Sequence, residues 1–382
     1  MNDAAALLAA VPDWTLLAAF AAAVLLSSPA STLLPRAVVL AAAGALTMVP
    51  LGAVGPLLGV AVAASVLLLD RGDKSTPRVA VVGLLAAGCA IAGSLSTVGY
   101  DARNIADGPE SAARMLQGLA TLAFALAAAL LLLVWPLSTF ATGAGKQRAM
   151  PLVVALWAVA AIVLIARGCG ELDPAIPADI ERPWFGATAF TCLVAGLLAV
   201  AHSDLRLKLT CLTLSQTTWI AGTFATAVQP SVLTPRLIAA AMAAVLAASI
   251  VDRLVVRYGS SEIADYGGLA TLYPGWTAAL GGSLLLLVGP LPLVDPLAGA
   301  LLAPGPSVSS NLTWLVLGGG LASVVAAFDL FTRLAIGRLD RPVFSPPLFE
   351  ASHGPERNLL PPLRGLAAVV ILLSAALLRL GL

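Results

Sequence analysis

Charge is scarce in this chain: 11% of its 382 residues are charged, whereas 59% are hydrophobic. A net charge of +1 excludes electrostatic binding of nucleic acid, which needs many cationic groups. Two histidines and four singly placed cysteines argue against a zinc or haem site, so we expect no metal and no cofactor. The mean hydropathy of +0.97 leaves no room for a soluble domain, and the lipid bilayer is the expected partner.

The apolar residues fall in runs of membrane-spanning length. The stretches 119–134 and 238–250, for example, contain no ionisable side chain. A bilayer core requires roughly 20 apolar residues in helical form, because no water is present there to satisfy the backbone. We therefore predict an all-α integral membrane protein with about twelve transmembrane helices, near residues 8–27, 33–50, 52–69, 79–99, 115–142, 150–167, 185–202, 209–228, 235–256, 272–303, 311–334 and 363–381.

Basic residues gather in every second connection between these spans. Arg71, Lys74 and Arg78, for example, share one connection, whereas the intervening connections 101–110 and 171–181 are acidic or mixed. Under the positive-inside rule the basic connections lie in the cytoplasm, and twelve spans then place both termini outside. The expected location is the cell membrane, which in a bacterium is the inner membrane.

Prolines predict two discontinuous helices. The run 272–303 is too long for one plain span and contains Pro290, Pro292 and Pro296 beyond its middle. A second break is expected at Pro136, because proline removes a backbone donor and clashes with the preceding turn. Inside a bilayer such breaks persist only where protein or water covers them. Paired broken helices indicate an ion or substrate path, by analogy with inverted-repeat transporters.

One segment carries a family resemblance. Ser203-Asp-Leu-Arg-Leu-Lys208, continuing into Leu212-Thr-Leu-Ser-Gln216, resembles the D-I/L-K-R-x-L-A-Y-S-S-x-S/A-Q/H motif of antiporter-like membrane subunits. Such subunits occur in respiratory complex I (NADH:quinone oxidoreductase), in related membrane-bound hydrogenases and in multisubunit cation/proton antiporters. Shorter segments resemble further motifs of this family in the family's order: Trp135-Pro-Leu-Ser-Thr-Phe140, Glu262-Ile-Ala-Asp-Tyr-Gly-Gly-Leu269, Gly289-Pro-Leu-Pro292 and Phe331-Thr-Arg333.

The resemblance implies an antiporter-like, inverted-repeat transmembrane domain over residues 111–382. Residues 1–110 would form N-terminal transmembrane helices without a family match. In this family, lysines, histidines and one glutamate at mid-membrane are thought to pass protons. The positions that correspond to these residues here have hydrocarbon side chains: Leu131, Val153 or Val159, Ala240–Ala244 and Ala300. The early glutamate has no counterpart, because 101–110 is expected to be a loop. Hydrocarbon cannot titrate, so we expect the scaffold to be kept and the usual relay to be largely lost.

Four polar residues near a predicted cytoplasmic helix start are candidates for an ion path. Asp204, Arg206 and Lys208 are explained by membrane topology and, for Asp204, by the helix dipole; a place in the path is the alternative. His202 beside them is either an interface residue or a proton-transfer group.

Four more candidates lie within or near the predicted spans. Ser215 and Gln216 either form interhelical hydrogen bonds or line a water wire. Ser138 lies at the first break, where its hydroxyl would cap the broken helix. Asp295 lies in the second break, either as a carboxylate that meets water and titrates or as a plain extracellular charge.

Other features have structural interpretations. Asp329 and Arg333 have the i, i+4 spacing of an ion pair near a helix end. The glycines Gly318–Gly320 favour close helix packing. Tryptophans near span ends predict an aromatic belt at the membrane interface, formed by Trp135, Trp184, Trp219, Trp276 and Trp314.

Two functions fit this pattern. The first is a membrane subunit of an ion- or proton-translocating complex, possessing no redox centre of its own and working beside other membrane subunits, as in a redox-driven pump. The alternative is a stand-alone polytopic membrane protein that kept the fold for small-solute transport or assembly scaffolding. The ordered motifs favour the first function, and the depletion of titratable groups favours the second.

Overall fold

A computed structural model describes residues 51–66, 76–105, 110–134, 138, 150–171, 178–223, 230–289 and 310–337. Regular structure in these ranges is helical throughout, apart from one isolated antiparallel bridge between Asp204 and Glu262. The prediction of an all-α protein is therefore confirmed for this part of the chain.

Nine helices of 15 residues or more occupy the described ranges. Each overlaps a predicted span, and the bounds are α4 Leu51–Val66, α5 Thr76–Ile105, α6 Glu110–Leu131, α8 Met150–Glu171, α9 Ala178–Ala201, α10 Leu205–Thr223, α11 Pro230–Tyr258, α13 Pro274–Val288 and α15 Ser310–Ile336. Two short elements, the 3-10 turn η3 (Ile263–Asp265) and α12 (Leu269–Leu272), lie between α11 and α13. The predicted spans 8–27, 33–50 and 363–381 lie outside the described residues, so the count of twelve and the inverted repeat stay predictions.

Several of these helices suit a bilayer by length and composition. Three described segments are long and apolar enough to cross it, namely Thr76–Val98, Pro183–Ala201 and Trp314–Ile336. Large apolar side chains such as Leu84, Leu95 and Phe328 lie exposed on their outer faces, where water would be unfavourable and lipid is not. The chain is a multi-pass membrane protein.

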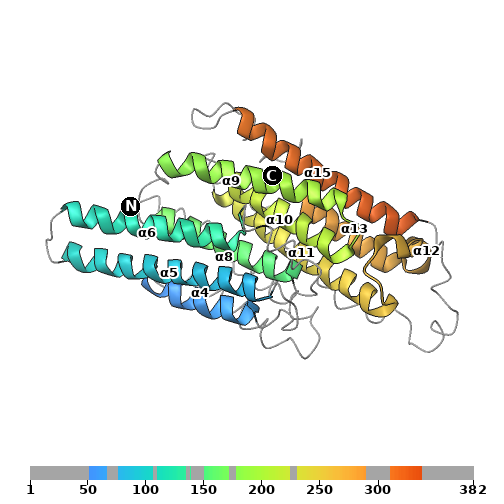
Figure 1. The fold of residues 1–382 in the computed structure, drawn as a ribbon, viewed down its shortest axis with the longest axis horizontal. Helices are drawn as coiled ribbons and strands as arrows, with labels where there is room; N and C mark the ends of the chain where they lie inside the picture. Colours follow the sequence, from blue (N-terminus) through green and yellow to red (C-terminus); the bar gives the residue numbers. More distant parts are fainter. Residues whose placement is uncertain are drawn as a thin grey trace.

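The helices form an elongated bundle in which α10 is central. Figure 1 shows α4, α5 and α6 side by side in one half of the molecule and α9 to α15 in the other. α8 packs against helices of both halves. α10 contacts α8, α9, α11, α13 and α15, so it has neighbours on all sides and little contact with the exterior.

Glycines allow α9 and α15 to approach each other closely. A Cβ atom on Gly319 of α15 would lie 2.6 Å from the backbone carbon of Cys192 on α9. A Cβ atom on Gly196 of α9 would lie 2.6 Å from the carbonyl oxygen of Gly319. The two backbones approach this closely because neither residue has a side chain, as the sequence predicts for Gly318–Gly320.

Two acidic connections differ from their prediction. Asp101 lies in the last turns of α5, and Asp179 and Glu181 lie in the first turn of α9, although 101–110 and 171–181 were expected to be loops. A helix of 30 residues such as α5 is roughly 45 Å long, longer than the roughly 30 Å bilayer core, so its ends reach water while remaining helical. The charged residues therefore mark where each span leaves the membrane, and the helix itself continues beyond that point.

The aromatic belt prediction is wrong for three tryptophans. Trp184, Trp219 and Trp276 are buried within the bundle, whereas Trp314 is exposed. The indole of Trp184 donates to the carbonyl of Ala221 at 3.4 Å, and Trp219 covers Gly320. These rings fill space between helices and do not face the membrane interface; Trp135 lies outside the described residues.

Both proline motifs follow the end of a described helix. α6 ends at Leu131 and is followed by Leu133, whose φ of 50° stops the helix before Pro136. α13 ends at Val288, and Gly289 adopts a φ of 81° directly before Pro290. Pro136, Pro290, Pro292, Asp295 and Pro296 themselves lie outside the described residues, so the continuation of either helix beyond its break stays a prediction.

Candidate functional site

The buried face of α10 is unusually polar for the centre of a membrane bundle. Six of its uncharged polar side chains are each at most 2% exposed; we call them the polar axis, and they are Thr210, Thr213, Ser215, Gln216, Thr217 and Thr218. α10 is too polar to count among the apolar spans. It can lie at the centre of the bundle because five helices enclose it.

The threonines of the polar axis bond to their own helix. Thr210 donates to the carbonyl of Arg206 and Thr213 to that of Leu209, both at 2.9 Å, and Thr218 donates to Leu214 at 2.8 Å. A hydroxyl that bonds to the preceding turn is satisfied without water or a partner helix. The axis is therefore polar in composition yet internally saturated at these positions.

Ser215 instead joins three helices. Its hydroxyl donates to the carbonyl of Cys192 on α9 at 2.9 Å and accepts from the hydroxyl of Ser323 on α15 at 2.7 Å. The Cys192 thiol lies 3.5 Å from the same oxygen. Of the two roles considered for Ser215, the interhelical hydrogen bond is the one present in the structure; Gln216 beside it is 2% exposed.

Replacing Ser215 with alanine is expected to lower the free energy of unfolding by about 1 kcal/mol, because the Cys192 carbonyl loses its side-chain donor. Thr213→Val is the matched control: it also removes a buried hydroxyl from α10, but that hydroxyl bonds only within the helix, at Leu209. Denaturant titration in detergent micelles measures both variants. Equal stability losses in the two would contradict the interhelical role.

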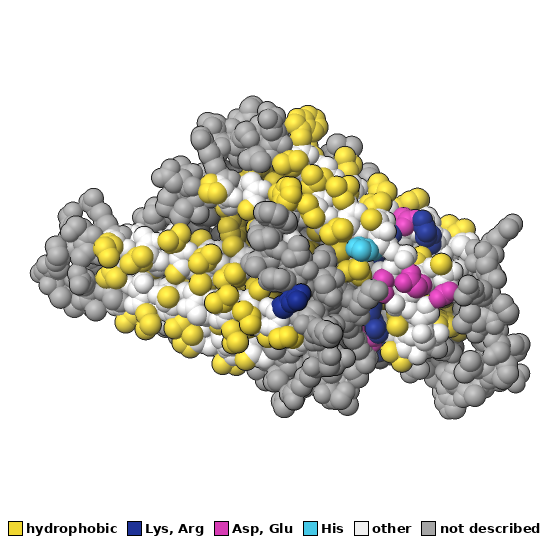
Figure 2. Space-filling view, viewed as in Figure 1, with side chains coloured by type: hydrophobic (Ala, Val, Ile, Leu, Met, Phe, Trp, Pro, Cys, Tyr) yellow, Lys and Arg dark blue, Asp and Glu magenta, His cyan; other side chains and the backbone are white. Residues whose placement is uncertain are grey.

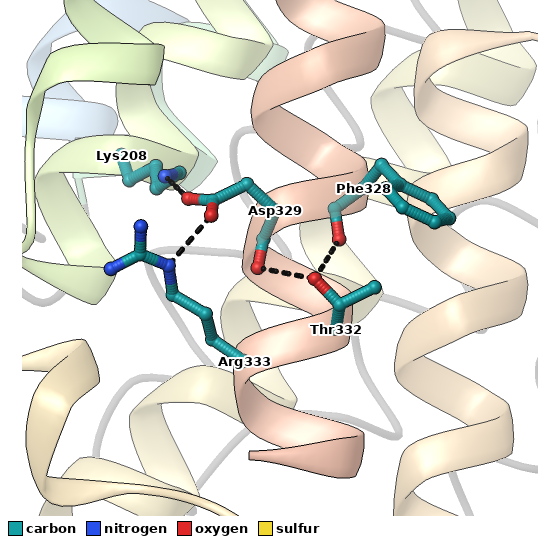
Figure 3. Close-up of polar contacts among 5 residues, drawn as sticks. All are labelled: Lys208, Phe328, Asp329, Thr332 and Arg333. Atoms are coloured by element: carbon teal, nitrogen blue, oxygen red, sulfur yellow. Dashed lines mark hydrogen bonds and ion pairs between the residues drawn. The ribbon is translucent and has the colours of Figure 1, made fainter.

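An ion pair between a buried lysine and a partly exposed aspartate lies at the start of α10. Lys208 is 1% exposed, and its Nζ lies 2.6 Å from Oδ2 of Asp329 on α15 (Figure 3). Oδ1 of the same carboxylate accepts from Nε of Arg333 at 2.6 Å, the expected i, i+4 pair. Membrane topology alone therefore does not describe Lys208, since its ammonium faces a carboxylate and not an aqueous connection. It falls at the first variable position of the family motif.

Two further contacts hold the same end of α10. Arg206 donates to Oδ1 of Asp252 on α11 at 2.9 Å. Asp204 precedes the helix, and its Oδ1 accepts from the backbone N–H of Leu207 at 2.9 Å, so the carboxylate caps α10 as its predicted dipole role requires. Its Oδ2 accepts from the hydroxyl of Ser261, which ties the cap to the loop after α11, at 2.6 Å.

The loop 259–268 is held to this end by further polar contacts. Ser203 donates to Glu262 at 2.7 Å, and the backbone N–H of Ile263 donates to the carbonyl of Ser203 at 2.9 Å. The hydroxyl of Tyr266 donates to the carbonyl of Ser260. Burial, together with the nearby carboxylate of Asp265, raises the pKa of Tyr266, so its phenol stays neutral. In Figure 2 most charged side chains on the visible face gather at this end of the bundle.

Sequence reasoning missed the partners of Arg206 and Lys208. Asp252 and Asp329 lie 46 and 121 residues further along the chain, beyond the reach of any local pattern. The sequence does show a single carboxylate in each partner helix, Asp252 in α11 and Asp329 in α15, but Arg253 and Arg333 on the same helices offer local partners and leave the pairing with α10 open. His202 is half-buried just beyond the end of α9 and next to this cluster.

The expected relay positions hold buried hydrocarbon. Leu131, Val153 and Ala240 are each at most 1% exposed, as are Ala243 and Ala244. The side chain of Val159 and residue Ala300 lie outside the described part, and Ser138 at the first break is buried. Among the described residues, no three His, Cys, Asp or Glu side chains gather in a metal-binding arrangement.

No family model matches the chain, and no curated protein is similar to it. Solved structures are similar. A chain of respiratory complex I from Thermus thermophilus is 16% identical with a TM-score of 0.64, and the match covers 96% of this chain and 84% of that one. A chain of the Mrp complex from Dietzia sp. is 16% identical with a TM-score of 0.65, over 95% and 78%. A chain of the archaeal membrane-bound sulfane sulfur reductase is 17% identical with a TM-score of 0.64, over 94% and 62%.

These structures define the class of the protein: an all-helical membrane protein with the fold of chains from complex I, the sulfane sulfur reductase and the Mrp complex. The antiporter-like fold expected from the short motifs is thereby confirmed, at identities where fold is all that the likeness establishes. With 96% of the chain covered, the match extends into α4 and α5, where the sequence shows no family motif.

Proposed function

We propose that this chain is a membrane subunit of a multisubunit ion-translocating complex, with a structural or reduced part in transport. The observation that supports the proposal most is the likeness over 94–96% of the chain to chains of three such membrane assemblies. Other membrane subunits are then its partners, the bacterial inner membrane is its location, and any redox chemistry belongs to neighbouring subunits.

The reduced role in transport follows from the hydrocarbon at the relay positions. A proton relay needs titratable groups joined by short water wires. Leu131, Val153 and Ala240 offer neither a titratable group nor a hydrogen-bonding side chain for a water wire, and each is buried. Residues 111–382 would supply the antiporter-like domain and residues 1–110 additional helices that pack beside it.

Partner capture tests the subunit role. A tagged chain solubilised in mild detergent is expected to copurify with other polytopic membrane subunits, identified by mass spectrometry. A matched polytopic membrane protein with the same tag controls for adventitious capture. A chain that repeatedly purifies alone would contradict the proposal and favour a stand-alone protein for small-solute transport or scaffolding.

Flux measurements test the reduced role. The purified chain in proteoliposomes is expected to show no proton flux driven by a Na⁺ or K⁺ gradient, because hydrocarbon fills the relay positions. Internal pH is followed with an enclosed dye, and Asp295→Asn is measured in parallel. Robust flux that Asp295→Asn abolishes would mean that a substitute path runs through the second break.

A further inference from the structure

Three charged side chains at the charged end of α10 become less exposed from the surface inward. The side chain of Arg333 is 63% exposed, that of Asp329 28% and that of Lys208 1%. Asp329 therefore stands between an exposed guanidinium and a buried ammonium (Figure 3). Through these three side chains, charge leads from the surface to the buried ammonium of Lys208 on α10.

A hydrocarbon layer lies behind the ion pair. Beyond Lys208, the same face of α10 carries Leu212 and then Ser215, and α15 correspondingly carries Ala326 and then Ser323. Leu212 and Ala326 are both 0% exposed. The ion pair and the Ser215–Ser323 pair, joined across the same two helices, are thus separated by roughly 10 Å of helix that contains packed apolar groups on this face.

We propose that the Lys208–Asp329 pair, with this hydrocarbon behind it, seals the polar axis against water and protons. The ammonium faces the carboxylate, and the hydroxyls of Thr213, Ser215 and Ser323 behind the pair bond to protein. Nε of Arg206 at the same end is buried without a hydrogen-bond partner, so this end can hold water in front of the pair while the described hydroxyls behind it need none. A buried charge that loses its partner recruits water instead. Water would then enter the polar axis from its charged end, because polar side chains hold water and hydrocarbon side chains exclude it.

The seal deepens the proposed function, because a subunit with few relay groups preserves an ion gradient only if its polar core does not leak. Lys208 falls at a variable position of the motif, and Asp329 lies outside the motif segments given above.

Proton leak in vesicles tests the seal. The full chain is reconstituted in vesicles of phosphatidylethanolamine and phosphatidylglycerol with an enclosed pH dye, and a K⁺ diffusion potential with valinomycin drives protons. Asp329→Asn is expected to leak severalfold faster than the wild type. Lys208→Met combined with Asp329→Leu is expected to restore the wild-type rate, because hydrocarbon then closes the gap. Arg78→Gln, which neutralises an exposed charge on α5 in the other half of the bundle, should leave the rate unchanged.

A native thiol reports water in the same vesicles. Cys211 lies one turn beyond Lys208 and is 0% exposed, so a water-soluble maleimide should label it only after water enters the axis. Peptide mapping by mass spectrometry separates it from the other cysteines. Labelling of Cys211 is expected to rise severalfold in Asp329→Asn and to return to the wild-type level in the double variant.

The outcomes separate the seal from its rivals. A folded Asp329→Asn protein that leaks no faster than the wild type overturns the proposal, and one that conducts less makes the pair a proton-exchange site instead. Should Asp329→Asn not fold, Lys208→Gln decides by the same criterion, since Asp329 keeps Arg333 as its partner. Partner capture is independent: a chain that purifies alone but leaks as expected retains the seal and loses the subunit role.

Discussion

Asp329→Leu should lower the free energy of unfolding by about 3 kcal/mol, since it leaves the buried ammonium of Lys208 without its carboxylate. The loss is large because Lys208 is 1% exposed, so its ammonium would be buried without a counter-charge. Denaturant titration in detergent micelles, with helix content as the signal, provides the measurement.

The double variant isolates the ion pair from packing. Lys208→Met added to Asp329→Leu removes both charges and keeps similar volume, so most of the lost stability should return. Arg333→Gln removes the exposed partner of the same carboxylate and should change stability little, as surface pairs contribute about 0–1 kcal/mol. A single Asp329→Leu variant as stable as the wild type would show that the buried ammonium needs no partner.

Gly319→Ala should destabilise the protein by about 3 kcal/mol, because its new methyl group would meet the backbone of α9. The Cβ atom would lie 2.6 Å from both the carbon and the sulfur of Cys192, and backbone cannot swing aside as a side chain can. The α9–α15 contact must open to admit the methyl, which also strains the hydrogen bonds between Ser215, Cys192 and Ser323.

The neighbouring glycine supplies a matched control. A Cβ atom on Gly318 would have Leu193 Cδ1 as its nearest atom at 3.4 Å, the movable end of a side chain. Gly318→Ala should therefore be neutral or slightly stabilising, since alanine is the better helix former. Denaturant titration of both variants under identical conditions measures the difference in their free energies of unfolding. Equal losses of stability would show that helix propensity, and not the close α9–α15 contact, decides the effect at this site.

The two sites suggest how α10 is held. Glycines bring α9 and α15 together. The hydrogen bonds of Ser215 with Cys192 and Ser323, which we call the serine cluster, then attach α10 to both helices, and the Lys208–Asp329 ion pair attaches it to α15 nearer the charged end. The loop 259–268 and Asp252 complete the attachment at the charged end. A polar helix is stable at the centre of a membrane protein under these conditions because each of these polar groups meets protein instead of lipid.

The sequence by itself determined the environment and the helices. Hydrophobic runs without charge permit only helices in a bilayer, and the proline and glycine positions locate where α6 and α13 end, because those constraints act through the local backbone. The short motifs around Asp204 and Glu262 were sufficient to predict the fold that the solved structures share. The absence of titratable groups at the relay positions was equally readable, since it depends on composition alone.

Only the tertiary structure decided which polar residues meet. Lys208 appears in the sequence as one of several charges at a helix start, and its partner lies 121 residues away on α15. Trp184, Trp219 and Trp276, which the sequence suggests as membrane anchors, are packed inside the bundle instead. In uniformly apolar helices the sequence pattern does not determine which face points inward, and here the rotation of each helix turns the tryptophan toward a neighbouring helix. Pairing across helices depends on long-range packing, and so the ion pair and the serine cluster become visible only once the bundle is assembled.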